Sequence, residues 1–156
     1  MVIRIPDSAD ELRAVAQLFD AYRVFYRARS NPNAAYEFLL ERWRLRESVL
    51  FAAYDGAQPI GFVHLYPLFL SVEMRRFWLL NDLYVDPSTR RSGVGRELMR
   101  RAERHARETD AAGLMLSTAM DNVKAQALYE SESYERDDAF YVYNRLFASP
   151  PYEGES

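Results

Sequence analysis

The spacing of apolar and polar residues predicts two helices near the start of the chain. Apolar side chains recur at helical spacing over residues 12–22 and again over residues 36–43. Ser8 and Glu11 stand in the positions of a capping box, in which the serine accepts a backbone hydrogen bond and the glutamate reaches back to another N–H. A short β-type run over residues 2–5 precedes both helices, so the chain is expected to open as strand, helix, helix.

The middle of the chain has the pattern of a sheet. Val49–Tyr54, Ile60–Leu70 and Phe77–Val85 are predicted strands, and the first two are joined by a turn at residues 55–56. Pro67 indicates a bulge or a sheet edge within the second strand. The third is almost continuously apolar, which is typical of a central strand covered on both faces.

A long helix and a further strand follow. Residues 93–107 have one apolar face, formed by Val94, Leu98, Met99, Ala102 and Ala106. A strand over residues 114–117 comes next, and a strand–helix–strand crossover gives a parallel pair. A short helix at 123–130 and an aromatic hairpin at 140–147 close the fold. The fold class expected is α/β (α+β), with a mainly antiparallel mixed sheet, in a single domain of residues 1–148, followed by a disordered tail at 149–156.

Composition narrows the possible functions. The 156 residues contain no cysteine and only two histidines, His64 and His105, so neither a thiol nucleophile nor a metal site is expected. A net charge of -3 does not favour nucleic-acid binding. No apolar run reaches the ~18 residues of a membrane span and no signal peptide is seen, so a cytoplasmic location is expected. His64 is interpreted as structural rather than as a base, and His105 as a surface residue.

The loop between the third strand and the long helix is rich in arginine and glycine. A dinucleotide fingerprint fails because Leu98 stands where its third glycine belongs. A P-loop fails because Arg96 and Glu97 follow Gly95, so no hydroxyl is available for Mg²⁺. The form that fits is R-x-x-G-x-G, from Arg90 to Gly95. Taken alone, that form also describes a solvated surface turn.

This loop has the physical features of an anion site. Consecutive amides from Arg91 to Arg96 precede or begin a helix, whose dipole stabilises an anion by roughly 0.3–1 kcal/mol. Gly93 and Gly95 lack a Cβ and allow close approach of a phosphate. A pyrophosphate is therefore the expected ligand.

The sequence resembles the GNAT acetyltransferase superfamily over most of its length. The resemblance rests on the order of elements and on LNDLYV followed by DPSTRRSGVGREL, which is similar to the histone-acetyltransferase-like and small-amine branch. It implies a GNAT-like fold and acetyl-CoA as co-substrate. The expected cofactor-binding residues are Leu83, Val85, Arg90, Arg91, Ser92, Gly93, Val94, Gly95, Arg96 and Asn122. Of these, Leu83 and Val85 are expected to pair with the pantetheine arm through their backbone.

Two catalytic residues are expected. By resemblance, Asn122 contacts the cofactor and Tyr129 protonates or hydrogen-bonds the departing CoA thiolate, although many helix tyrosines are core aromatics. Asp82 is a carboxylate within an apolar strand, where an unpaired charge is costly. It is interpreted either as the group that holds the acceptor ammonium or relays its proton, or as a structural acceptor for neighbouring groups. Ser133 departs from the family, which commonly has glycine at this turn.

The resulting hypothesis is an N-acetyltransferase that moves acetyl from acetyl-CoA to a primary amine, a small molecule or a lysine-type acceptor, by direct attack in a ternary complex. The alternative is a non-catalytic acyl-CoA-binding or regulatory domain on the same fold. Glu73, Tyr22, Tyr26, Tyr36 and Trp43 are candidates to line the acceptor pocket, although the first two helices also need a core. A homodimer is expected, paired through the aromatic hairpin. The identity of the acceptor cannot be read from the sequence.

Overall fold

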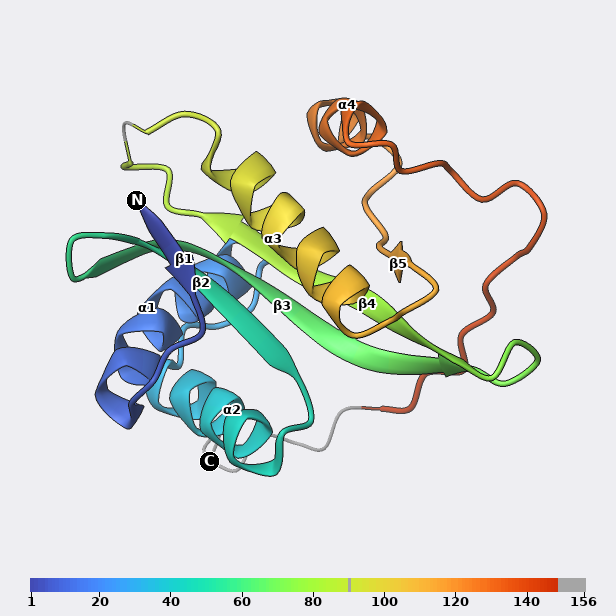
Figure 1. Ribbon diagram of the computed structural model, residues 1–156. Helices are drawn as coiled ribbons and strands as arrows, with labels where there is room; N and C mark the ends of the chain where they lie inside the picture. The colour runs from blue at the N-terminus through green and yellow to red at the C-terminus, as the bar shows by residue number, and fades with distance from the viewer. Residues whose placement is uncertain (90, 149–156) are drawn as a thin grey trace. The chain divides into compact units, whose positions relative to one another are not determined.

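The computed structural model describes residues 1–89 and 91–148 (Figure 1). The elements follow in the order β1 (Val2–Arg4), α1 (Ala9–Phe25), α2 (Pro32–Leu45), β2 (Val49–Asp55), β3 (Gln58–Leu70), β4 (Arg75–Val85), α3 (Val94–Glu108), β5 (Leu114–Met115) and α4 (Val123–Ser131). The five strands form one sheet in chain order, antiparallel from β1 to β4 and parallel between β4 and β5. The predicted fold class is confirmed.

The described residues form two compact units, one ending at Asn122 and one beginning at Val123. The first contains the whole sheet with α1, α2 and α3, and the second contains α4 and the segment after it. The predicted single domain of residues 1–148 stays a prediction. Arg90 and the tail 149–156, which the sequence predicts to be disordered, lie outside the described residues.

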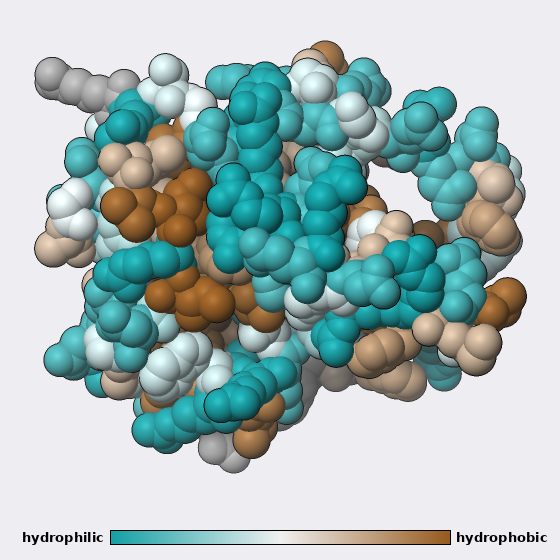
Figure 2. Space-filling model, in the orientation of Figure 1, coloured by the Kyte–Doolittle hydropathy of each residue, from teal (hydrophilic) through white to brown (hydrophobic). Residues whose placement is uncertain are grey.

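The two faces of the sheet are covered by different helices. Figure 1 shows α1 and α2 on one face and α3 on the other. The apolar stripe predicted for α3 is confirmed residue by residue, since the same five side chains are buried. Hydrophilic residues cover the outer surface of α3 in the space-filling view of this side (Figure 2). The helix is therefore amphipathic, with its apolar face toward the sheet and its polar face toward solvent, as the sequence predicts.

His105 is the exception on α3. Its ring lies 4.8 Å from that of Trp78 and 5.4 Å from that of Phe51, so the expected surface position is wrong. Burial lowers the pKa of His105, and the positive charge of Arg101 lowers it further. The histidine serves here as a packing residue.

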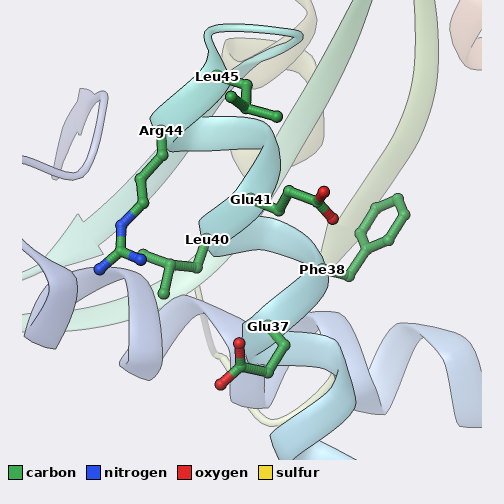
Figure 3. Close-up of a pocket in the computed structure, with 6 residues that line it drawn as sticks. All are labelled: Glu37, Phe38, Leu40, Glu41, Arg44 and Leu45. Carbon is green, nitrogen blue, oxygen red and sulfur yellow. The ribbon is translucent and has the colours of Figure 1, made fainter.

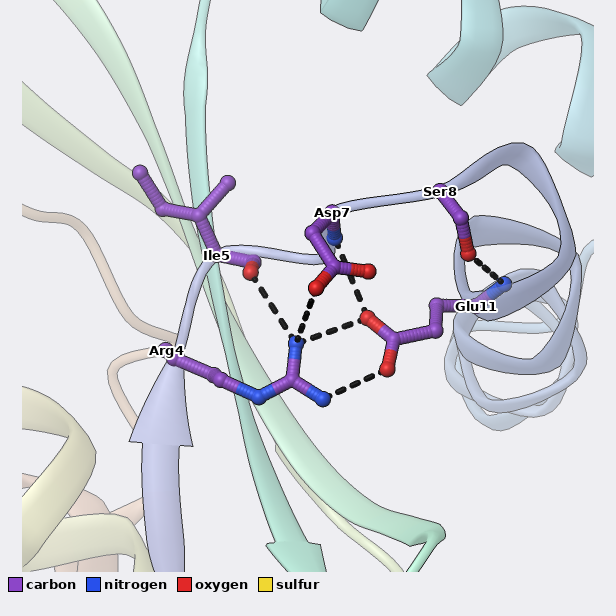
Figure 4. A network of polar contacts seen from close by, with 5 residues as sticks. All are labelled: Arg4, Ile5, Asp7, Ser8 and Glu11. Atoms are coloured by element: carbon purple, nitrogen blue, oxygen red, sulfur yellow. Dashed lines mark hydrogen bonds and ion pairs between the residues drawn. The ribbon is translucent and has the colours of Figure 1, made fainter.

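The start of α1 is tied to β1 by a polar network (Figure 4). Ser8 Oγ accepts the Glu11 N–H at 3.2 Å, as the capping box predicts. Glu11 does not reach back to Ser8, because its Oε2 accepts the Asp7 N–H at 3.0 Å and the Arg4 guanidinium at 2.7 Å. The bond from Arg4 is the main reason that the pKa of Glu11 falls to about 2.

An aromatic cluster fills the core between α1 and the sheet. Phe62, fully buried on β3, lies 6.0 Å from Phe19 and 5.8 Å from Tyr22, both edge to face. Tyr84 on β4 lies 6.0 Å from Tyr22. Edge-to-face pairs of this kind add to the stabilisation from burial. The aromatic end of α1 is thereby anchored over the middle of β3 and β4.

Pro67 lies where β3 is an edge. The first residue of β2, Val49, pairs with Leu65, so the later part of β3 has no β2 partner. A proline lacks the N–H that such a partner would need. The predicted edge is confirmed, and the register shift of β3 against β4 falls instead between His64 and Leu65.

The closing hairpin predicted at residues 140–147 is wrong. No strand forms among the described residues of the second unit. Six apolar side chains are between 81% and 90% exposed: Phe140, Tyr141, Val142, Tyr143, Leu146 and Phe147. An isolated two-stranded hairpin is marginal in water without a sheet or helix to pack on. A segment rich in aromatic residues is therefore insufficient by itself to form strands here.

The turn after α4 is a Schellman motif built on a serine. The Tyr134 N–H donates to Tyr129 O at 3.0 Å and the Ser133 N–H to Glu130 O at 3.1 Å. Ser133 has φ +68°, the left-handed conformation that glycine adopts at no steric cost. The serine thus accepts the dihedral that glycine commonly supplies in the family that the sequence resembles.

Ser133→Gly is expected to stabilise this turn by about 0.5 kcal/mol. The left-handed conformation costs an L residue about 1–2 kcal/mol, and the greater freedom of unfolded glycine offsets about 0.5–1 kcal/mol of that gain. The measurement is hydrogen exchange of the Tyr134 amide. Ser131→Gly, the same change inside α4, is the control and should destabilise. Faster exchange in Ser133→Gly would contradict the prediction.

Candidate active site

The N-terminus of α3 is built to leave its amides open. Gly93 is the N-cap, with φ +81°, and its carbonyl accepts the Glu97 N–H at 3.0 Å. Glycine has no side chain with which to cap the helix, and the first N–H groups of a helix lack partners within it. A Cβ at Gly93 would meet nothing within 4 Å, so the glycine is needed for its dihedral rather than for lack of space.

The predicted loop residues lie around this helix start. Arg91 and Ser92 are exposed, Val94 is buried against the sheet, and Gly95 and Arg96 are half-buried in the first turn. Arg90 lies outside the described residues. The arrangement joins outward amides to guanidinium groups, which is the chemistry that a pyrophosphate requires. The assignment of these residues to a cofactor stays a prediction.

The edge of β4 is open beyond its short pairing with β5. β5 pairs only with Trp78 and Leu79 among the described residues. The Asp86 N–H donates to Ile60 O on β3 at 2.9 Å, and alternation turns the backbone groups of Leu83 and Val85 to the opposite edge. These two predicted residues thus present unpaired backbone groups where an extended ligand can add as a strand.

This open edge leads to the loop. A Cβ built on Gly95 would lie 3.8 Å from Val85 Cγ2, in ordinary contact. Gly61 of β3 lies on the other side of Val85, where a Cβ would approach Tyr84 O at 2.9 Å and Val85 Cα at 3.4 Å. The end of β4 and the first turn of α3 therefore form one continuous surface.

A β-bulge on β4 decides where Asp82 points. His64 pairs with Asp82 and Leu65 with Leu80, so Asn81 is an extra residue on β4. Before the bulge, Trp78 packs on His105 of α3. Without the bulge, strict alternation would place Asp82 on that same face.

After the bulge, the alternation is inverted. Tyr84 packs beside Tyr22 of α1, and Asp82, two residues earlier, shares that face. Bulges commonly re-aim a side chain next to an active site. The Asp82 carboxylate therefore lies on the face of the sheet that α1 and α2 cover.

Asp82 is buried, with 6% of its surface exposed. Asn81 Nδ2 donates to its Oδ1 at 3.1 Å, and His64 Nδ1 lies 3.2 Å from its Oδ2. His64 is itself 1% exposed, and its Nε2 lies 2.6 Å from Ser48 Oγ. His64 is therefore buried in the sheet, and its partner is the candidate catalytic carboxylate.

Asp82 contributes to the wall of a cavity of about 420 Å³ between α1 and α2. The other lining residues are Phe19, Tyr22, Arg23, Ala34, Ala35 and Phe38. Of the aromatic candidates from the sequence, Tyr22 is the one found in this lining. Phe19 and Phe38 were missed, because their helical spacing is equally that of a core face. The lining combines aromatic rings, the Asp82 carboxylate and the guanidinium of Arg23, whose charge is paired with Asp20. Aromatic rings beside a carboxylate suit an organic cation.

A second hollow of about 480 Å³ lies along α2 (Figure 3). Its lining residues are Glu37, Phe38, Leu40, Glu41, Arg44 and Leu45, all from that one helix. It contains none of the predicted catalytic or cofactor residues. We assign no role in catalysis to it.

Asn122 and Tyr129 lie on either side of the boundary between the two units. The Asn122 N–H donates to Ala119 O at 3.1 Å at the end of the first unit. Tyr129 lies on α4, with its ring 6.3 Å from that of Tyr134. The catalytic role of Tyr129 and the cofactor contact of Asn122 stay predictions.

A model of the acetyltransferase (GNAT) family matches residues 15–133. The chain belongs to the GNAT family. It is 43% identical over 130 residues to an uncharacterized N-acetyltransferase, YhfO, of Bacillus subtilis, covering 83% of this chain and 87% of that protein. It is 29% identical over 125 residues to a probable acetyltransferase of Haemophilus influenzae, covering 80% and 84%.

Solved structures agree with this assignment. The GNAT chain superposes on the crystal structure of a probable acetyltransferase with a TM-score of 0.90 and 37% identity, covering 96% of this chain and 100% of the other. Within residues 1–89 and 91–148, no helix is both long and apolar enough to cross a bilayer. The same residues contain no cluster of three or more potential metal ligands. The chain is thus an acetyltransferase by family and by fold.

Proposed function

We propose that this GNAT protein transfers the acetyl group of acetyl-CoA to a primary amine by direct attack in a ternary complex. The observation that carries the proposal is the position of Asp82, buried in the wall of an aromatic cavity on the strand whose open edge leads to the α3 N-terminus. One strand thereby serves both substrates. The amine approaches from the α1 and α2 face, and acetyl-CoA lies along the open edge.

Acetyl-CoA supplies a thioester, and this chain supplies the groups that hold it. The amides at the start of α3, with Arg91 and Arg96, bind the pyrophosphate. The backbone of Leu83 and Val85 pairs with the pantetheine arm, and an N–H near Val85 polarises the acetyl carbonyl. Asn122 contacts the cofactor near the start of α4.

Asp82 holds the ammonium rather than removing its proton outright. An amine has a pKa near ~10 and a carboxylic acid a pKa near ~4. Direct proton transfer from the ammonium to the carboxylate is therefore uphill by about 8 kcal/mol. One proton leaves the ammonium for water, and the nitrogen then bonds to the acetyl carbon as the carbon–sulfur bond breaks. The acetylated nitrogen then loses its second proton to water, Tyr129 gives its proton to the thiolate, and water returns a proton to the Tyr129 phenolate.

Replacing the loop arginines is expected to weaken acetyl-CoA binding selectively. Arg91→Ala and Arg96→Ala should each raise the KM for acetyl-CoA about three- to ten-fold, since each removes one cationic contact to phosphate. The kcat at saturation should stay within about two-fold. Steady-state kinetics at two ionic strengths test this, because added salt screens the same contacts.

Arg107→Ala is the matched control for these two variants. Arg107 lies on the last turn of α3, is 78% exposed and pairs with Glu103. Its removal changes net charge by the same amount at the far end of the same helix. An equal rise in KM in all three variants would mean that general charge, and not the loop, attracts the cofactor.

The direct test of the proposed function is acetyl transfer by the purified chain. Acetyl-CoA is mixed with a panel of polyamines, amino compounds and lysine peptides, release of CoA thiol is followed, and products are identified by mass spectrometry. An acetylated amine supports the proposal. Tight acetyl-CoA binding without turnover on any amine would favour the non-catalytic acyl-CoA-binding alternative.

We also propose that the protein acts as a homodimer in the cytoplasm. The exposed apolar side chains of residues 140–147 support a second protein surface at that segment.

A further inference from the structure

Three side chains from separate segments form a continuous polar chain under the acceptor cavity. Ser48 precedes β2, His64 lies on β3, and Asp82 lies on β4. Ser48 Oγ is 2.6 Å from His64 Nε2, and His64 Nδ1 is 3.2 Å from Asp82 Oδ2. Only Asp82 of the three lines the cavity. This series of hydrogen-bonded side chains therefore runs from the cavity wall into the protein interior.

The chemistry of the partners sets the direction of these bonds. A carboxylate only accepts, so the imidazole must donate through Nδ1 to Asp82. In a neutral imidazole, Nε2 is then an acceptor, and it takes the Ser48 hydroxyl proton. The bond made by one ring nitrogen thus fixes the role of the other, as with histidines that serve metal ions.

We propose that His64 is a positioning residue, which holds the Asp82 carboxylate toward the acceptor amine through its Nδ1–H and is itself anchored at Nε2 by the Ser48 hydroxyl. This role rests on the proposed function. Asn81 binds Oδ1 and His64 binds Oδ2, so both oxygens have a fixed orientation. Each oxygen still has a lone pair for the incoming ammonium.

The position of His64 argues against a purely space-filling role. It is 1% exposed between strands, where an apolar side chain of similar volume would be cheaper to bury. Its ring packs 4.7 Å from that of Tyr66, and Phe62 lies two residues before it on the same face. The bulge at Asn81 brings Asp82 opposite His64 across the two strands. A histidine at this position is explained by its hydrogen bond to the Asp82 carboxylate, which an apolar side chain could not make.

Two amide substitutions distinguish the role of Nδ1 of His64 from the role of Nε2. In His64→Asn, the amide nitrogen replaces Nδ1 and can still donate to Asp82. In His64→Gln, the amide reaches the position of Nε2 and Ser48 but leaves Asp82 without its donor. Both variants bury an amide of lower volume, so they control for each other in stability.

The two variants are expected to differ in kcat/KM for the amine. His64→Gln should lower kcat/KM for the amine about 30-fold and His64→Asn about three-fold, the scale of one hydrogen bond to a charged group. The KM for acetyl-CoA should change less than about two-fold in both. An equal loss in the two variants, with an active wild type, would overturn the positioning role and leave His64 as a packing residue.

A second measurement does not depend on turnover. Nitrogen-15 spectra of the two imidazoles in the wild-type protein at neutral pH report which nitrogen of His64 carries the proton, and His105 is identified with a His105→Gln variant. A proton on Nδ1 in the wild type, kept in Ser48→Ala because Asp82 still accepts it, supports the inference. A proton on Nε2 alone overturns it. A wild type that acetylates no amine would overturn the proposed function instead, and with it this role.

Discussion

Asp82→Asn is expected to lower kcat/KM for the amine about 100- to 1,000-fold, since removing one partner of a desolvated charge pair costs about 3–4 kcal/mol. The change keeps the shape of the side chain and removes its charge. The amide nitrogen of asparagine also faces the ammonium or His64 with a donor, where an acceptor is needed. The KM for acetyl-CoA should hardly change, because the groups proposed to bind it lie at the start of α3 and on the open edge of β4. Steady-state kinetics with each substrate varied in turn measure both effects.

The control for this variant is the other buried aspartate of the first unit. Asp20 is also 6% exposed, and it accepts bonds from Ser30 Oγ, the Asn31 N–H and Arg23. Burial alone would raise its pKa, and these donors outweigh burial and lower it. Asp20→Asn should therefore reduce stability above the pKa of an unfolded aspartate, and the difference from wild type should shrink as the pH falls.

The two aspartates separate catalysis from folding. A loss of amine turnover in Asp82→Asn, but not in Asp20→Asn, would assign the charge of Asp82 to the acceptor. If Asp82→Asn keeps kcat/KM within about five-fold of wild type, the carboxylate is a structural acceptor for Asn81 and His64. The inference that the acceptor amine binds in the cavity between α1 and α2 would then lose its support.

The sequence predicted the elements well because local pattern decides them. The stripe on α3, the hairpin turn and the edge at Pro67 follow from helical period, turn chemistry and the missing proline N–H. The turn lies at residues 56–57, one residue later than predicted, because Asp55 still pairs with Gln58. The second strand of the parallel pair is shorter than expected, since β5 ends at Met115. Its short pairing leaves β4 open, and strand length is set by partners rather than by propensity.

The site was less predictable, and the bulge explains why. Strict alternation groups Asp82 with Leu80 and Trp78, which face α3. One extra residue at Asn81 moves the carboxylate to the opposite face and brings it to His64. No feature of a single sequence marks Asn81 as the extra residue. The contact between two candidate groups 18 positions apart could therefore be seen only in the structure.

Tyr129→Phe is expected to lower kcat about 100-fold without abolishing turnover, as general acids commonly contribute about 10²–10⁴-fold. A thiol near pKa ~8.5 is a tolerable leaving group, and proton transfer from a tyrosine near ~10 is uphill by roughly 2 kcal/mol. The phenol therefore assists departure of the thiolate but is not indispensable. The KM for acetyl-CoA should stay within about two-fold, because the pyrophosphate contacts are unchanged.

Tyr134→Phe is the control, since it removes the same hydroxyl from the ring beside Tyr129 in the second unit. A solvent isotope effect on kcat in the wild type, reduced in Tyr129→Phe but kept in Tyr134→Phe, would assign the transferred proton to Tyr129. Equal kcat values in all three proteins would make Tyr129 a packing residue.

The variant Asp82→Asn/Tyr129→Phe joins the two predictions, because each residue serves a different substrate. Independent effects multiply, so turnover should fall about 10⁴- to 10⁵-fold while affinity for CoA is nearly intact. Such a protein would bind acetyl-CoA as the non-catalytic alternative does, and comparing it with the wild type separates binding from transfer on the same fold. If affinity for CoA falls as far as turnover does, the two residues support the fold rather than the chemistry.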